Sequence, residues 1–242
     1  MSSSKEEIAL HIQNVSKKYG DHQALTNVSF SVKKGEIFGL LGANGAGKTT
    51  LINILTGIIT PNTGNITYFG QPLNENIKNQ INVSTAYRSL SGSLTIEQNL
   101  RVYANIYNVD NPQEKIDYLL KELLIEDIRH SWAREISSGQ KTRANLAKAL
   151  INSPQLLFLD EATAGLDPQI ASKVRKIIKE LDTTIIFTSH IMSEVEELCD
   201  QIAFLREGKI LSIDTAKQYK KTLKKKQATL EDVFIAIAEN KL

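Results

Sequence analysis

The chain alternates polar and apolar residues in some segments and is continuously apolar in others. In "NVSFSV", residues 27–32, the side chains of Val28, Phe30 and Val32 fall on one face and polar side chains on the other. This period of two predicts a strand with one exposed face, closed by a turn at residues 33–36.

Three further segments are apolar almost throughout. They read "IFGLLG" (37–42), "LLFLDE" (156–161) and "TTIIFTS" (183–189). Such runs are typical of parallel strands that are covered on both faces. Each precedes a turn and a helical pattern, which predicts a doubly wound α/β fold with a mainly parallel sheet.

Between about residues 88 and 153 the apolar residues take a helical spacing. Thr95 and Gln98 have the spacing of a capping box, and Asn111-Pro112 is typical of a helix start. The apolar positions that follow are three and four residues apart: Ile116, Leu119, Leu120, Leu123 and Leu124. We therefore predict a helical subdomain inserted into the α/β core.

After residue 200, "QIAFLREGKILSI" predicts a hairpin that turns at Glu207-Gly208. A lysine-rich stretch, 217–226, and an amphipathic terminal helix follow it. The resulting organisation is one domain, 1–242. Its parts are a core with a β-subdomain at about 8–87 and 154–215, a helical subdomain at about 88–153, and a C-terminal helical tail at 216–242.

Composition narrows the class of protein. With 242 residues, 41% hydrophobic and 23% charged, the chain has the composition of an ordinary globular protein. A formal net charge of +2 is too small to favour nucleic acid as a partner. The single cysteine, Cys199, excludes an internal disulfide framework and suits a reducing compartment. No run approaches the roughly 18 apolar residues of a membrane span, and the N-terminal residues lack a secretory pattern. We therefore expect a chain that does not cross a membrane by itself.

The segment "GANGAGKTT", residues 42–50, fits the phosphate-binding pattern G-x-x-x-x-G-K-[ST]. It lies between a buried strand and a helical pattern, so backbone N–H groups and the positive end of the helix would converge on phosphate oxygens. Lys48 would reach the β- and γ-phosphates, and the Thr49 hydroxyl would ligate Mg²⁺. The residues expected to contact the nucleotide are Asn44, Gly45, Ala46, Gly47, Lys48, Thr49 and Thr50.

Asp160 and Glu161 stand at the end of an apolar run, where a parallel strand meets its ligand-binding edge. Asp160 would hold Mg²⁺, through water. Glu161 would polarise the water that attacks the γ-phosphate. A solvated acidic turn that ends a strand is the alternative interpretation, and the phosphate-binding pattern favours the catalytic one.

A second anion-binding pattern lies about ninety residues further on, in "EISSGQKTRANLAKAL", residues 135–150. A Ser/Gly-rich helix start offers N–H donors and a favourable dipole to phosphate. The alternative is that the serines only cap the helix. Two other residues stay open on sequence physics alone: His190, which follows an apolar run, and Tyr19, which lies beside a turn.

Taken together, these motifs resemble the ATP-binding subunit of an ABC transporter. They occur in that family's order: Tyr19, the loop at 42–50, the signature "ISSGQ" (136–140), "LLFLDE", the D-loop "AGLD" (164–167) and "TSH" (188–190). The resemblance implies a P-loop core with a mainly parallel sheet, an N-terminal antiparallel β-subdomain and an inserted helical subdomain. It further implies Mg-ATP as the ligand and His190 as the sensor of the γ-phosphate. Tyr19 would stack on the adenine.

The resemblance also explains why one chain has two phosphate-binding patterns. Two subunits would pack head to tail, so that each ATP lies between the P-loop of one and the signature of the other. The residues facing ATP across this dimer would be Ser137, Ser138, Gly139, Gln140 and Asp167. The implied assembly is a homodimer, or a heterodimer with a similar ATPase. It would be cytoplasmic and held on the inner face of the membrane by a separate permease, without nucleic acid.

One segment departs from the family pattern. In "INVSTAYRSLSGSLTIEQNL", residues 81–100, no glutamine stands where the family has a Mg²⁺ ligand, and Ala86 or its neighbours take the place. The "RS…LT…NL" arrangement and the terminal "ATLEDVFIAIAENKL" resemble ABC-2-type export ATPases. Export is therefore the predicted function. The alternatives are a soluble ABC ATPase, such as the cluster-assembly type, and a binding module that does not hydrolyse ATP.

Overall fold

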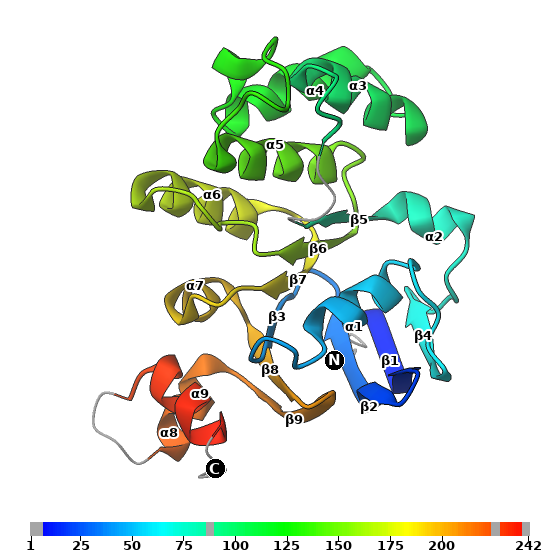
Figure 1. The fold of residues 1–242 in the computed structure, drawn as a ribbon, viewed down its shortest axis with the longest axis vertical. Helices are drawn as coiled ribbons and strands as arrows, with labels where there is room; N and C mark the ends of the chain where they lie inside the picture. The colour runs from blue at the N-terminus through cyan, green and yellow to red at the C-terminus, as the bar shows by residue number, and fades with distance from the viewer. Residues whose placement is uncertain (1–6, 86–89, 224–227, 239–242) are drawn as a thin grey trace, which may run out of the picture. The chain divides into compact units, whose positions relative to one another are not determined.

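The computed structural model describes residues 7–85, 90–223 and 228–238. The chain forms two compact units, shown in Figure 1. The first unit comprises residues 1–77 and 183–242, and the second comprises residues 78–182. Each is described here by itself.

An antiparallel sheet of three strands opens the first unit, in the order β2-β1-β4. Phe30 pairs with Ile12, and its ring stacks on Phe38 with the centroids 4.9 Å apart. Val28, Phe30 and Val32 are buried, as their alternation predicts. The strands are β1 (Ile8–Tyr19), β2 (His22–Lys33) and β4 (Thr63–Tyr68).

Parallel strands form the centre of the first unit. β3 pairs in parallel with β7 on one side and with β8 on the other, and β9 pairs antiparallel with β8. Every residue of β3 and β7 is buried, which confirms the interpretation of these apolar runs. The predicted hairpin turns at Glu207 and Gly208, both at positive φ. The strands are β3 (Ile37–Leu41), β7 (Thr184–Thr188), β8 (Gln201–Arg206) and β9 (Lys209–Asp214).

Four helices complete the first unit. The predicted terminal helix is present and packs on β8, where Phe234 lies 6.1 Å from Phe204, ring centroid to ring centroid. Tyr219 meets the same ring edge-on at 4.9 Å. The lysine-rich stretch falls partly in α8 and partly outside the described residues. The helices are α1 (Lys48–Leu55), α7 (Met192–Leu198), α8 (Ala216–Thr222) and α9 (Leu230–Ala238).

The second unit contains two parallel strands and most of the helical residues. Figure 1 shows α3, α4 and α5 gathered in one bundle. The Thr95–Gln98 capping box is formed, and α4 begins at Pro112, as predicted. The elements are α2 (Glu75–Gln80), which leads in from the first unit, β5 (Ile81–Ser84), α3 (Ile96–Ile106), α4 (Pro112–Glu122), the 3-10 helix η1 (Glu126–Ile128), α5 (Ser138–Leu150), β6 (Leu156–Asp160) and α6 (Pro168–Glu180).

Arg129 forms ion pairs with three helical elements of the bundle. The guanidinium of Arg129 contacts Glu97 at 3.1 Å, Asp117 at 2.6 Å and Glu126 at 3.0 Å, so it joins α3, α4 and η1. A hydrogen bond from Gln113, together with Arg129, holds the pKa of Glu97 below its ordinary value. The observed strands and helices confirm the predicted fold class: mainly parallel strands, an N-terminal antiparallel sheet and inserted helices.

Candidate functional site

The loop between β3 and α1 has the conformation of a phosphate-binding loop. Its peptide chain turns through a hydrogen bond from the Ala46 N–H to the Ala43 carbonyl, 3.1 Å long. Gly45 and Gly47 both have positive φ, at 79° and 109°. Gly47 also occupies the N-cap position of α1, and no side chain caps the helix. The first turn of α1 therefore presents its positive end to the loop without a side-chain acceptor in front of it.

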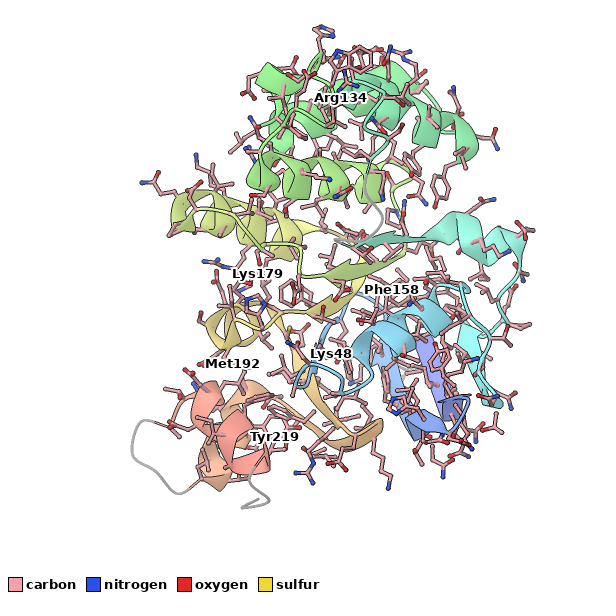
Figure 2. The ribbon with its side chains drawn as sticks, in the orientation of Figure 1. Lys48, Arg134, Phe158, Lys179, Met192 and Tyr219 are labelled. Atoms are coloured by element: carbon pink, nitrogen blue, oxygen red, sulfur yellow. The ribbon has the colours of Figure 1, made fainter. Side chains whose placement is uncertain are left out.

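Lys48 lies back over this loop. Its Nζ donates to the carbonyl oxygens of Gly42, at 2.6 Å, and Ala43, at 3.1 Å, and Figure 2 shows it beside the start of α1. An ammonium held there adds a positive charge to the helix end, which suits a polyphosphate. Thr49 is exposed in the first turn, where its hydroxyl can reach a cation. The sequence-predicted loop residues of the first unit are thus gathered around one helix start.

The β8–β9 hairpin holds the loop from behind, which the sequence did not reveal. The Gly208 N–H donates to the Ala46 carbonyl at 3.0 Å, and the Gly208 carbonyl accepts from the Thr26 N–H at 2.8 Å. A Cβ atom on Gly208 would lie 2.5 Å from the carbonyl oxygen of Ala24. Only glycine fits this contact, which joins the loop to β2. The one sequence signal was the turn dipeptide Glu207-Gly208 itself.

His190 stands exposed after β7, on a turn fixed by buried polar groups. The Ser189 hydroxyl donates to Glu194 Oε2 at 3.0 Å and accepts from the Ile191 N–H at 3.0 Å. Both Ser189 and Glu194 are buried. Sequence reasoning missed this pair, because a serine and a glutamate five residues apart carry no distinctive pattern. The pair orients the turn that presents the imidazole.

Tyr19 ends β1 and is 47% exposed. The ammonium of Lys17 lies 5.3 Å from the centre of its ring and donates to the Thr60 carbonyl at 2.7 Å. The ring is therefore accessible as a stacking surface, with a cation beside it. Adenine stacking on Tyr19 stays a prediction.

In the second unit, the carboxylates of Asp160 and Glu161 follow one another at the end of β6. Asp160 is half-buried and Glu161 is exposed. Glu161 has a φ of 55°, a left-handed conformation that is uncommon outside glycine and recurs at functional sites. Its carbonyl accepts from the Ala164 N–H at 3.1 Å, which starts the turn that leads to Asp167.

The D-loop ends in a helix cap. Asp167 is the N-cap of α6, and its Oδ1 accepts from the N–H groups of Gln169 and Ile170, both at 3.1 Å. The carboxylate therefore already has two backbone donors. Asp167 would make its predicted contact with nucleotide through the other carboxylate oxygen.

The signature segment begins α5 with a complete capping box. The Ser137 hydroxyl accepts from the Gln140 N–H at 3.2 Å, and Gln140 Oε1 accepts from the Ser137 N–H at 2.9 Å. Ser137 therefore does cap the helix, as the alternative interpretation held. This cap uses two of the N–H donors at the start of α5. The N–H groups of Ser138 and Gly139 lie in the first turn and have no acceptor within the helix. These two donors are what the segment can offer to an anion.

Each unit offers an oxygen ligand of the kind that magnesium binds together with phosphate. Among the described residues, no group of three or more His, Cys, Asp or Glu side chains is placed to hold a metal. Mg²⁺ needs no such group, because it retains several waters and binds through one or two protein oxygens together with phosphate. Thr49 in the first unit and Asp160 in the second each carry one such oxygen, and their role as ligands stays a prediction. Ala86, the position of the missing glutamine, lies outside the described residues.

A family model and several known proteins match this chain. The family model described as "ABC transporter" matches residues 25–164. The Nod factor export ATP-binding protein I of Rhizobium meliloti (strain 1021) is 37% identical over 212 residues, which are 84% of this chain and 63% of that protein. The linearmycin resistance ATP-binding protein LnrL of Bacillus subtilis (strain 168) is 35% identical over 214 residues, 85% of this chain and 69% of that protein. The chain thus spans less than two thirds of the Nod factor protein.

Solved structures match the fold over most of its length. An ATP-binding subunit of an ABC transporter superposes with a TM-score of 0.87 at 26% identity, covering 95% of this chain and 99% of that one. A dimeric ATP-binding cassette with bound ADP and phosphate superposes with a TM-score of 0.79 at 23% identity, covering 85% and 98%. In the described part of this chain, no helix has the length and apolar character of a membrane span.

The role of Gly208 can be tested by Gly208→Ala. Alanine costs about 1 kcal/mol or more at positive φ, and here its Cβ would also collide with the Ala24 carbonyl and push the hairpin off the loop. We expect the affinity for a fluorescent ATP analogue to fall about fivefold, which corresponds to about 1 kcal/mol of lost loop preorganisation.

Gly70→Ala is the matched control, since Gly70 has a φ of 80° and open space where its Cβ would lie. It should lower the unfolding midpoint without changing the affinity. An equal loss of affinity in both variants would show that the Gly208 contact does not position the loop.

Proposed function

Because this chain belongs to the ABC transporter family of ATP-binding proteins, we propose that it binds and hydrolyses Mg-ATP to drive export through a separate membrane permease. One observation carries the proposal: the chain has two helix starts suited to phosphate, α1 behind Gly47 and α5 behind Ser137. One ATP per chain needs only the first. A second helix start is explained if two copies share two ATP molecules.

The P-loop of the first unit binds the phosphates of ATP. The Lys48 ammonium neutralises the β- and γ-phosphates, and the first-turn N–H groups of α1 donate to phosphate oxygens. Thr49 would hold a magnesium ion directly and Asp160 would hold it through water, and the ion would neutralise charge on the phosphates. Tyr19 stacks on the adenine.

Hydrolysis is an in-line displacement on the γ-phosphorus. Glu161 accepts a proton from the attacking water as the new oxygen–phosphorus bond forms, and the bond from phosphorus to the β–γ bridging oxygen breaks. The products are ADP and inorganic phosphate. His190 contacts the γ-phosphate and so registers whether it is present.

Dimerisation couples this chemistry to movement. The signature donors of Ser138 and Gly139 contact the γ-phosphate of the ATP bound to the opposite copy, with Ser137, Gln140 and Asp167 beside them. Loss of the γ-phosphate removes this bridge and allows the dimer to open. The partner is a second copy or a similar ATPase.

Two relatives named for export support export as the transport direction. Both are called Nod factor export ATP-binding protein I, one from Rhizobium meliloti (strain 1021) and one from Cupriavidus metallidurans, and they are 37% and 35% identical to this chain. We infer a cytoplasmic subunit held at the inner face of the membrane by the permease, without nucleic acid. A soluble ABC ATPase of the cluster-assembly type is the second candidate; a neighbouring gene for a protein of about six membrane spans would favour the transporter.

Hydrolysis is tested by Glu161→Gln. The amide cannot accept the proton, so we expect turnover to fall by roughly 10²-fold or more while ATP still binds. Steady-state phosphate release measures this. The control is Glu180→Gln, an exposed carboxylate at the end of α6, which should keep wild-type turnover. Undiminished turnover in Glu161→Gln would remove this residue from the catalytic role.

The missing glutamine is tested by a Mg²⁺ titration of ATPase activity. If water fills the ligand position, Ala86→Gln should lower the half-maximal Mg²⁺ concentration by about threefold or more, since a side chain holds the ion more rigidly than water does. The alternative is that Ser84, Thr85 or Ser89 supplies the oxygen directly. An unchanged requirement in Ala86→Gln, with a raised one in Ser84→Ala, Thr85→Ala or Ser89→Ala, would refute the water-filled site and identify the substitute.

A further inference from the structure

A hydrogen bond joins α5, the helix that begins at the signature, to the turn that follows Glu161, the proposed general base. The Thr142 hydroxyl, one turn into α5, donates to the Ala164 carbonyl at 3.0 Å. The same oxygen lies 3.1 Å from the Ser138 carbonyl, so one proton is shared between two acceptors. The contact to Ser138 is the common bond of a threonine to the residue four positions earlier. The contact to Ala164 leaves the helix and reaches the D-loop.

Backbone packing reinforces this link. A Cβ atom on Gly139 would lie 3.1 Å from the Gly165 carbonyl oxygen and 3.4 Å from Leu166. A Cβ atom on Gly165 would lie 3.5 Å from the Ser138 hydroxyl. The first turn of α5 and the D-loop therefore lie in close contact at Gly139 and Gly165. Little space is left there for one to shift without the other.

Ala164 connects the contact to Glu161. The Ala164 N–H donates to the Glu161 carbonyl at 3.1 Å, while the Ala164 carbonyl accepts from Thr142. Ala164 is thus hydrogen-bonded through both of its peptide groups: its N–H to Glu161, and its carbonyl to Thr142 of the signature helix. Glu161 itself is held at positive φ, a conformation that depends on the surrounding turn.

We propose that Thr142 is a positioning residue that couples the two ATP sites of the dimer. This rests on the proposed function, in which the signature of one copy contacts the ATP of the other while Glu161 acts on the ATP of its own copy. Engagement of the signature by the opposite ATP then sets the D-loop, and through Ala164 the placement of Glu161. Thr142 itself touches neither nucleotide.

The test compares Thr142→Val, which keeps the shape of the side chain and removes the hydroxyl, with Thr142→Ser, which keeps the hydroxyl. The control is Thr222→Val in α8, where the hydroxyl donates to the Tyr219 carbonyl at 2.6 Å and serves no site residue. Four quantities are measured for each purified chain: kcat for ATP, the Hill coefficient for ATP, the affinity of the isolated subunit for a non-hydrolysable ATP analogue, and the unfolding midpoint.

We expect Thr142→Val to lower kcat about fivefold, the effect of one neutral hydrogen bond, and to lower the Hill coefficient toward 1. The affinity for the analogue should change less than twofold, because the P-loop binds it. Thr142→Ser should restore most of both losses, and Thr222→Val should match wild type in kcat and Hill coefficient.

Wild-type kcat and Hill coefficient in Thr142→Val would overturn the proposal. So would a loss that Thr142→Ser does not restore, or one that Thr222→Val shares. If the wild-type chain neither dimerises with ATP nor hydrolyses it, the proposed function fails, and this inference with it. A wild type that does both, beside an unaffected Thr142→Val, contradicts only the role of Thr142.

Discussion

The phosphate-binding loop of the first unit depends on the positive end of α1, which no side chain caps. A serine or aspartate at the N-cap would accept from one of the first-turn N–H groups and leave fewer donors for phosphate. Here Gly47 takes that position in a left-handed conformation. The surrounding protein must then hold a loop that lacks a local cap, and the Gly208 hairpin and the Lys48 ammonium do so. The start of α5 differs from that of α1, because Ser137 and Gln140 cap it. Two N–H donors of its first turn are left for an anion.

The other predicted site residues are divided between the two units. Glu161, Asp167 and the signature all belong to the second unit, where Thr142 of α5 donates to Ala164 in the turn between Glu161 and Asp167. His190 belongs to the first unit and is oriented by Ser189 and Glu194. Each unit thus holds its own share of the predicted site residues in place through its own hydrogen bonds.

The sequence predicted those structural features that depend on residues close together in the chain. The apolar runs, the Thr95–Gln98 capping box, the Pro112 helix start and the Glu207-Gly208 turn each depend on neighbouring residues, and each is confirmed. The contacts that position the site join residues far apart in the chain, such as Gly208 with Ala46 and Thr142 with Ala164, and no spacing rule reveals them. The roles of His190 and Tyr19 came from family resemblance, because a lone histidine or tyrosine carries no pattern.

We propose that the two helix starts serve two ATP molecules shared between two copies of the chain. The most direct measurement is a crystal structure of the Glu161→Gln variant with ATP and Mg²⁺, because this variant retains the γ-phosphate. We expect a dimer in which γ-phosphate oxygens accept from the first-turn N–H groups of α1 in one copy and from those of Ser138 and Gly139 in the other. An ATP-bound chain in which the signature donors contact no phosphate, or in which both helix starts surround a single ATP within one copy, would contradict it.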